Sequence, residues 1–119
     1  MNLKLQIASM LVAHRCANKK TQTQVAKMLN VTFQQVQKYE HMINKITSEK
    51  LLQFCLSLNV QLQSFQDGDP YQVLEGADIS IIEKEKAMQR IEKLTYDADL
   101  KPLLLTKEME ITNDQSSSR

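Results

Sequence analysis

The stretch TQTQVAKMLNVTFQQVQKYE, residues 21–40, contains five glutamines and the pattern T-x-x-Q twice. Thr21 and Gln24 fit a capping box, in which a threonine hydroxyl and a glutamine side chain bond the unpaired N–H groups that begin a helix. Thr32 and Gln35 repeat this arrangement eleven residues later. Asn30 lies between the two boxes and tolerates the left-handed backbone that often ends a helix. The stretch therefore predicts two short helices joined by a sharp turn.

Apolar residues at helical spacing extend this prediction to both sides. A first helix is expected over about 4–18, and the two capped helices then cover 21–29 and 32–41. Thr47 or Ser48 caps a fourth helix that ends at Asn59, and one more turn is expected within 60–65. Later in the chain, 80–94 is amphipathic, and a shorter helix is expected to begin at Pro102 and reach about residue 109. These elements predict an all-α fold, a bundle of four to five helices with a helical C-terminal extension.

The sequence QDGDPY, residues 66–71, is the clearest boundary, because it brings a glycine and a proline together. It divides the chain into an expected domain over 1–66, a linker over 67–79 and a helical segment over 80–112. The polar residues 113–119 predict a disordered tail.

Charge differs between the two halves of the chain. Residues 1–60 hold eight basic and two acidic residues, whereas 61–119 hold seven basic and twelve acidic residues. Such asymmetry favours a first half that binds a polyanion and a second half with another role. The alternative is a chance distribution in which the acidic helix is simply solvated.

Several classes of protein are disfavoured. No apolar run approaches the roughly 20 residues that span a bilayer, so we expect a cytoplasmic protein. Cys16 and Cys55 lie among apolar neighbours and are expected to be reduced thiols, and with His14 and His41 they form no zinc-binding spacing. Without a Gly-rich phosphate loop or a nucleophile pair, we expect no catalytic residues, no metal, no cofactor and no enzymatic activity.

The run RCANKKTQTQVAKMLNVTFQQVQKYE, residues 15–40, resembles the phage-repressor/Cro-like helix-turn-helix family of transcriptional regulators. The resemblance covers about residues 7–65 and implies a lambda-repressor-like bundle that binds double-stranded DNA. It also implies a structural ion pair between Arg15 of the first helix and Glu40, which closes the third. Ala26 matches the small residue that lets the two helices approach closely.

One position departs from the family pattern. The family places a glycine just after the glutamate that closes the third helix, whereas this chain has His41 and Met42. Either Asn44 supplies the left-handed residue, or the third helix continues for another turn. The geometry of phosphate contacts from 43–45 depends on which alternative holds.

The helix over 32–41 is the one that the resemblance places in the major groove. Glutamine can bond the edge of adenine, and an apolar ring can contact a thymine methyl group. Gln34 ranks above Gln35 as a reader, because Gln35 is needed to close its capping box. The predicted base contacts are Phe33, Gln34, Gln35 and Lys38. The predicted phosphate contacts are Gln22, Lys19, Lys20, Thr32, Asn44 and Lys45; for any single lysine, simple solubilisation is the alternative.

The apolar stripe of 80–94 must be buried somewhere, either against a second copy or against the same chain. Pairing with a second copy would give a dimeric repressor on a palindromic operator. The dimerisation residues would then be Ile81, Ile82, Met88, Ile91 and Leu94. A rival function is that of an antitoxin-like or adaptor protein, whose acidic C-terminal segment binds a partner protein.

Overall fold

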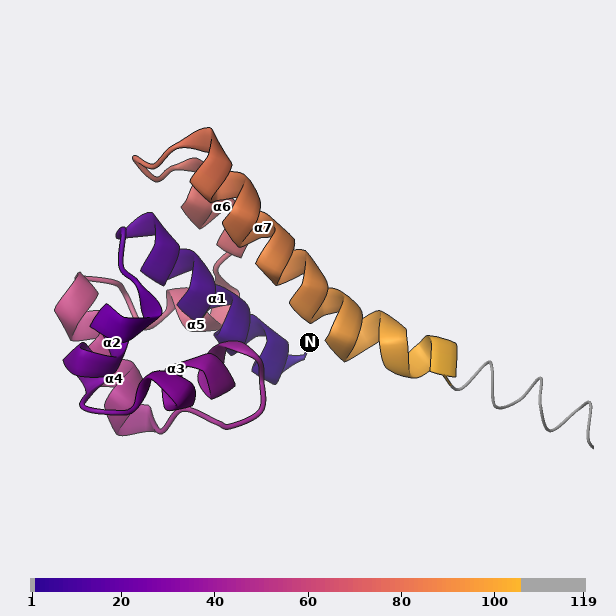
Figure 1. The fold of residues 1–119 in the computed structure, drawn as a ribbon, viewed down its shortest axis with the longest axis horizontal. Coiled ribbons are helices and arrows are strands. Elements are labelled where there is room, and N and C mark those ends of the chain that lie inside the picture. The colour runs from indigo at the N-terminus through magenta and orange to yellow at the C-terminus, as the bar shows by residue number, and fades with distance from the viewer. Residues whose placement is uncertain (1, 106–119) are drawn as a thin grey trace, which may run out of the picture.

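The computed structural model describes residues 2–105, and all regular elements in that range are helices (Figure 1). This confirms the predicted all-α, lambda-repressor-like fold. The elements are α1 (Leu3–Ala17), α2 (Gln22–Leu29), α3 (Phe33–Glu40), α4 (Ser48–Leu58), α5 (Ser64–Asp67), α6 (Pro70–Glu75) and α7 (Ile81–Thr95). A π-helical segment, η1 (Tyr96–Leu100), continues α7, and residues 101–105 are again α-helical.

Helix α1 lies at the centre of the fold and is packed on two sides. One side places Met10 and Leu11 in a core with side chains from α2, α3, α4 and α5, including Phe54. The other side places its small residues, Ala8 and Ala13, against α6 and α7. In Figure 1, α2, α3 and α4 lie on one side of α1 and α7 lies on the other. The first half of the chain therefore shares α1 with the second half.

The predicted helix starts follow the capping residues. Thr21 forms the complete capping box with Gln24, at 2.8 and 3.1 Å. Thr32 caps α3 by accepting from the Gln35 backbone N–H at 3.1 Å, but the second box is not closed. The Gln35 side-chain oxygen instead accepts from Asn44 at 3.3 Å. This second half of the prediction is therefore wrong, because a tertiary contact competes for the glutamine.

Left-handed residues follow four of these helices, beginning with Lys19 (φ 58°) after α1. Asn30 (φ 53°) and Asn59 (φ 54°) follow α2 and α4 directly, as asparagine favours. After α3, which ends at Glu40, the left-handed residue is Met42 (φ 63°). Neither alternative drawn from the sequence is correct, since Asn44 does not have a positive φ and the helix does not run on. Met42 packs against the core shared with α7, and this burial holds its unusual backbone in place.

The expected linker over 67–79 contains helix α6. Asp69 caps it, Pro70 occupies its first turn, and Leu74 is completely buried against α1 and α7. Gly68 permits the tight turn after α5, because a Cβ atom there would clash with the backbone carbonyl oxygen of Ser64. The boundary predicted at 66–71 is a tight turn between packed helices, so the linker was an incorrect prediction.

Helix α7 covers the stretch predicted over 80–94, and Ser80 caps its start by accepting from the Glu83 backbone N–H. Its apolar stripe divides in two: Met88, Ile91 and Leu94 pack against α1 and α6, whereas Ile81 and Ile82 are exposed. Met88, Ile91 and Leu94 are therefore packed against the same chain rather than left free for a second copy. The alanines of α1 allow this close packing. No helix begins at Pro102; the rod of α7 passes through η1 to residue 105. The expected continuation to residue 109 and the tail over 113–119 lie outside the described residues.

Candidate nucleic-acid interface

The outer face of α3 presents three of the four predicted base-contacting side chains to solvent. Phe33 is 39% exposed, and Gln34 and Lys38 are also exposed. The inner face of the same helix buries Val36 and Tyr39 in the core. Phe33 therefore keeps a substantial part of a large aromatic ring in contact with water, where it can meet another molecule.

The fourth predicted reader, Gln35, is half-buried. Its side-chain oxygen accepts from Asn44 Nδ2 at 3.3 Å, which joins the first turn of α3 to the loop that follows the helix. Gln35 therefore orients Asn44, a predicted phosphate contact, in addition to lying beside Gln34.

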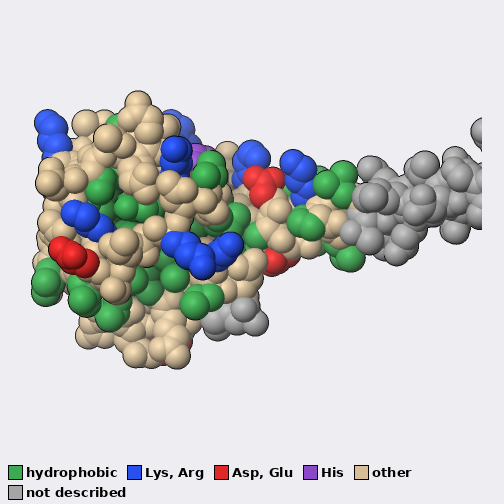
Figure 2. Space-filling view, turned by 90° about the horizontal axis from the view of Figure 1, so that it is seen from below, with side chains coloured by type: hydrophobic (Ala, Val, Ile, Leu, Met, Phe, Trp, Pro, Cys, Tyr) green, Lys and Arg blue, Asp and Glu red, His purple; other side chains and the backbone are tan. Residues whose placement is uncertain are grey.

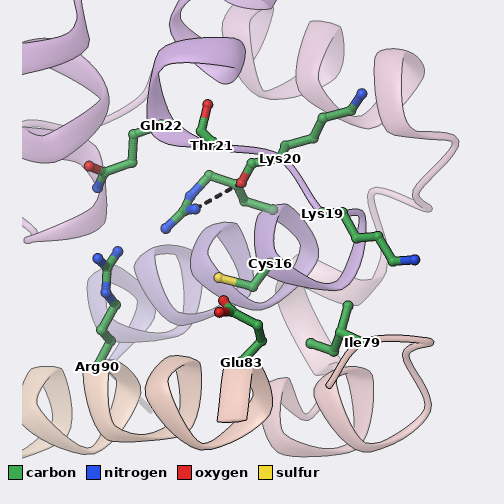
Figure 3. A pocket seen from close by; sticks show the side chains of 9 residues that line it. Cys16, Lys19, Lys20, Thr21, Gln22, Ile79, Glu83 and Arg90 are labelled. Carbon is green, nitrogen blue, oxygen red and sulfur yellow. Dashed lines mark hydrogen bonds between the residues drawn. The ribbon is translucent and has the colours of Figure 1, made fainter. Parts of the chain in front are cut away.

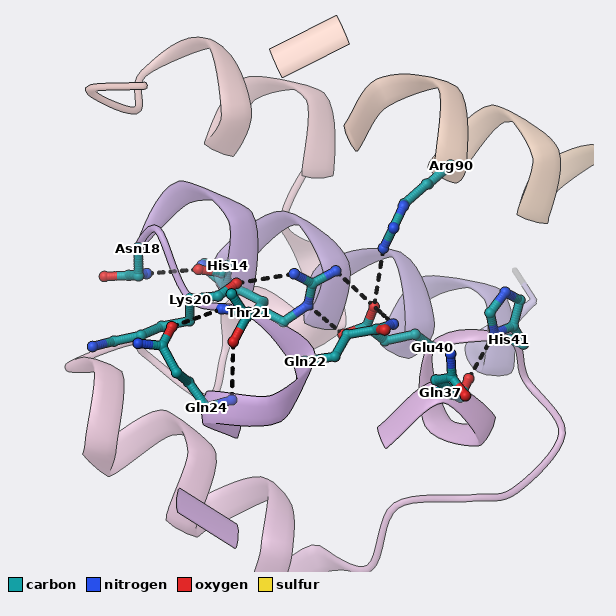
Figure 4. Close-up of polar contacts among 11 residues, drawn as sticks. His14, Asn18, Lys20, Thr21, Gln22, Gln24, Gln37, Glu40, His41 and Arg90 are labelled. Carbon is teal, nitrogen blue, oxygen red and sulfur yellow. Dashed lines mark hydrogen bonds and ion pairs between the residues drawn. The ribbon is translucent and has the colours of Figure 1, made fainter. Parts of the chain in front are cut away.

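A buried ion pair anchors the far end of α3 to α1 (Figure 4). Arg15 Nε donates to Glu40 Oε2 at 2.6 Å and Nη2 donates to Oε1 at 2.9 Å, with both side chains at most 7% exposed. Burial alone would lower the pKa of Arg15, but the hydrogen bond and charge of Glu40 outweigh it, so the pKa is raised. The predicted pair is thus the bidentate, desolvated form, which fixes the orientation of α3.

Two further side chains converge on this carboxylate. Gln22 Nε2, at the start of α2, donates to Glu40 Oε1 at 3.1 Å. Arg90 reaches the same oxygen from α7, with Nη1 at 3.9 Å. Arg15 also donates to the Lys20 carbonyl at 2.9 Å, so the turn before α2 belongs to the same network. One carboxylate therefore connects α1, α2, α3 and α7.

The contribution of Arg90 was not predicted from the sequence. Arg90 follows no motif, and its side chain is 56% exposed. The sequence does place Arg90 next to Ile91, and Ile91 is buried against α1. This neighbour could have indicated that Arg90 lies close to α1. That signal required knowing which element α7 packs against.

Helix α4 fixes the other end of α2. Lys50 Nζ donates to the Leu29 carbonyl at 2.7 Å, and Gln53 Nε2 donates to the Met28 carbonyl at 3.0 Å. These carbonyls belong to the last turn of α2, where they have no partner within the helix. The turn between α2 and α3 is therefore held from α4 as well as from the ion pair.

The predicted phosphate contacts lie around the ends of α2 and α3. Lys19, Thr32, Asn44 and Lys45 are exposed, while Lys20 and Gln22 are half-buried. Within residues 18–50 the acidic residues are Glu40, which is buried and paired, and Glu49. Figure 2 views the side of the globule with α4 and the loop after α3; basic side chains are spread across it and acidic ones lie toward its edges. This surface is suited to a polyanion.

A polar cleft of about 410 Å³ separates the α1–α2 turn from the start of α7 (Figure 3). Glu83 and Arg90 point into it from α7, toward Cys16 and Gln22. Burial raises the pKa of the Cys16 thiol. The cleft has four basic side chains and the carboxylate of Glu83 as its charged lining residues, and two of the basic ones, Arg15 and Arg90, also face Glu40. Its lining residues are Arg15, Cys16, Lys19, Lys20, Thr21, Gln22, Ile79, Glu83 and Arg90.

Comparison with known proteins finds a match over the region that contains α3 and its exposed face. A family model described as helix-turn-helix matches residues 11–65, from the middle of α1 to α5. Residues 11–65 are therefore similar to the helix-turn-helix family, and this match supports the resemblance to phage-repressor/Cro-like regulators of transcription. No curated protein and no solved structure matches the chain.

Residues 2–105 are the part of the chain that the structure describes. No helix in this range has the length and apolar character required to cross a membrane. Within the same range, no group of three or more His, Cys, Asp or Glu side chains is placed to hold a metal ion.

Proposed function

We propose that the protein is a sequence-specific regulator of transcription that reads operator DNA through the exposed face of α3. The observation that carries this proposal is the contrast between the two faces of that helix. Its inner face is fixed by Val36, Tyr39 and the buried Arg15–Glu40 pair, while Phe33, Gln34 and Lys38 face outward. A rigidly held helix with exposed polar groups is the arrangement that major-groove readers use.

Each outward side chain of α3 would contact DNA in its own way. Gln34 bonds the adenine edge of an A·T pair, and Phe33 contacts a thymine methyl group. Lys38, one turn further along, contacts a guanine edge or a phosphate. Gln35 has its oxygen engaged by Asn44, so it contributes a direct base contact less readily than Gln34.

Phosphate contacts fix the register of α3 on the duplex. Lys19, Lys20, Gln22, Thr32, Asn44 and Lys45 are the proposed donors, as the sequence suggested. Gln22 uses its amide nitrogen to bond Glu40, so any phosphate contact shares that group or uses the backbone N–H at the start of α2.

The finer proposal is a dimeric repressor on a palindromic operator. A single helix-turn-helix domain contacts few base pairs, and two copies reading half-sites about 34 Å apart supply the missing specificity. A repressor requires only that the bound dimer cover a promoter, and no catalytic group enters the proposal.

The test is selection of bound sites from random duplexes, with affinity then measured at several salt concentrations. The proposal expects a recovered palindrome with A·T pairs facing Phe33 and Gln34. It also expects a preference over unrelated duplexes of equal length that persists as salt rises. A protein that binds all duplexes equally, and loses that binding steeply with salt, would be a non-specific cation and would contradict the proposal.

A further inference from the structure

The rod that leaves the globule after Thr95 carries apolar side chains that the chain does not cover. Its large apolar side chains are between 44% and 56% exposed. By contrast, Ala87, Ile91 and Leu94 of α7 are buried against α1 and α6. Figure 1 shows the rod continuing away from the globule. The exposed residues are Tyr96, Leu100, Leu103, Leu104 and Leu105.

This run differs from the scattered apolar residues found on any protein surface. Five large apolar side chains lie within ten residues, and three of them follow one another directly. Tyr96, Leu100, Leu103 and Leu104 recur at spacings of four, three and one, which keeps them on one side of a helix. The described polar contact of this rod with the globule is a 3.5 Å hydrogen bond from Asn2 to Asp99. A contiguous exposed patch of this kind marks an interaction surface.

We propose that the rod over residues 96–105 pairs with the same rod of a second copy, running antiparallel, and that this surface joins the dimer. The inference rests on the proposed function, which calls for two copies on one operator. It moves the interface from the stripe over 81–94, whose central residues are already buried, to the segment that follows.

The charges of the rod favour a second copy over other occupants. Its charged residues are Asp97, Asp99 and Lys101, in the order acid, acid, base. In a copy that runs in the opposite direction and is centred on Asp99, Lys101 faces Asp97 of the partner subunit at both ends, and the two Asp99 side chains meet at the centre. Asp97 also pairs with Lys93 of its own helix at 3.0 Å. A duplex or an anionic membrane surface would instead require a cluster of basic residues, and the rod offers one lysine against two carboxylates.

The position of the globule is compatible with this pairing. Helices α1, α2, α3 and α4 all lie on one side of the rod formed by α7 and η1 (Figure 1). A two-fold axis that crosses the rod at right angles in the plane of that figure keeps both globules on the same side of the paired rods. The outer face of α3 is not part of the pairing surface, so both copies keep it for DNA.

The experiment is sedimentation velocity of the full chain without DNA, over a concentration series, for the wild type and three variants. Leu100→Glu/Leu104→Glu places charges on the rod. Leu56→Glu is the matched control, since Leu56 is 82% exposed on α4 and lies outside the rod. Ile81→Glu/Ile82→Glu tests the other exposed apolar residues of α7. Circular dichroism and thermal melting check that each variant remains folded.

The expected result is a dimer whose dissociation constant rises by on the order of 100-fold in the Leu100/Leu104 variant, a tenfold step for each leucine. The other two variants should dimerise like the wild type. A wild type that stays monomeric would overturn the inference, as would a dimer that only the Ile81/Ile82 change dissolves. If the Leu100/Leu104 variant melts early, the milder Leu100→Asn is measured instead against the same outcomes. Because DNA is absent, failure here leaves sequence-specific binding through α3 untouched.

Discussion

The two sides of α1 are packed by different means. Toward α2–α5, the large side chains Met10 and Leu11 meet aromatic rings, with Phe54 and Phe65 edge to face at a centroid distance of 6.1 Å. Toward α6 and α7, the small side chains of Ala8 and Ala13 let these helices approach α1 closely. The large side chain on this side is Leu74 of α6. The first side builds the helix-turn-helix core and the second attaches the C-terminal half. The family region and the rest of the chain therefore share one helix rather than forming separate domains.

The largest effect is expected from the polar centre that joins these elements. Glu40→Gln leaves the buried Arg15 without its counter-charge, which should lower the free energy of unfolding by about 3–5 kcal/mol. Chemical denaturation measures this change. Lys93→Gln is the matched control, because it breaks the exposed Lys93–Asp97 pair and should cost less than about 1 kcal/mol. Equal effects from the two changes would show that the Arg15–Glu40 pair is solvated.

The second side of α1 is tested by Ile91→Ala. Ile91 is 1% exposed, so its truncation should lower the free energy of unfolding of the whole chain by about 2–5 kcal/mol. Ile82→Ala, on the same helix but 64% exposed, should change it by no more than about 0.5 kcal/mol. If Ile91→Ala melted α7 alone and left the transition of α1–α5 unchanged, the two halves would be independent domains after all.

Gln34→Ala leaves both sides of α1 intact and tests the outer surface instead. It should weaken binding to the cognate operator by about 1–3 kcal/mol and relax the preference at one base position. Lys27→Ala, an exposed change on α2 outside the proposed contacts, serves as the comparison. Site selection with each variant checks this, and an unchanged base preference would remove Gln34 from the readers.

The smallest effect is expected from His14, on the side of α1 that faces α5. Its Nε2 lies 2.9 Å from the Ser64 hydroxyl oxygen. Since that hydroxyl donates to the Gln61 carbonyl, the oxygen accepts from a protonated Nε2. The His14 ring also packs at 5.5 Å from Phe65.

Burial lowers the pKa of His14 below its ordinary value of 6.5. The unfolded chain therefore takes up a proton first, so the contribution of His14 to stability is present above pH 6.5 and is lost as pH falls below it. Melting temperatures measured across this range should fall with pH in the wild type and fall less in His14→Gln. The variant His41→Gln, which changes an exposed histidine, is measured alongside for comparison.

The sequence predicted most of what local chemistry determines. Thr21, Thr32 and Thr47 cap their helices, and Asn30 and Asn59 end theirs, because capping depends on a few neighbouring residues. It missed α6, since six residues are too few to show a helical period and the turn residues around them predicted a linker. Alanines do not mark a packing face in a hydrophobicity pattern, so the surface of α1 that receives Ile91 could not be found.

The candidate interface shows the same difference between features set by neighbouring residues and features set by the packing of distant elements. The exposed positions of Phe33, Gln34 and Lys38 followed from helix periodicity, and the Arg15–Glu40 pair followed from the family resemblance. Gln35 bonding Asn44 and Arg90 approaching Glu40 depend on how distant elements pack, which the sequence alone does not specify. The role of each side chain on DNA remains a prediction.

The most direct test of the account is a map of backbone amide chemical shifts for the full chain, with and without its selected operator duplex. The account predicts that the largest changes fall on residues 32–38, with smaller ones at Gln22 and 44–45 and none along the rod over 96–105. Changes centred on α7 and the rod, with α3 unaffected, would contradict reading of DNA by α3.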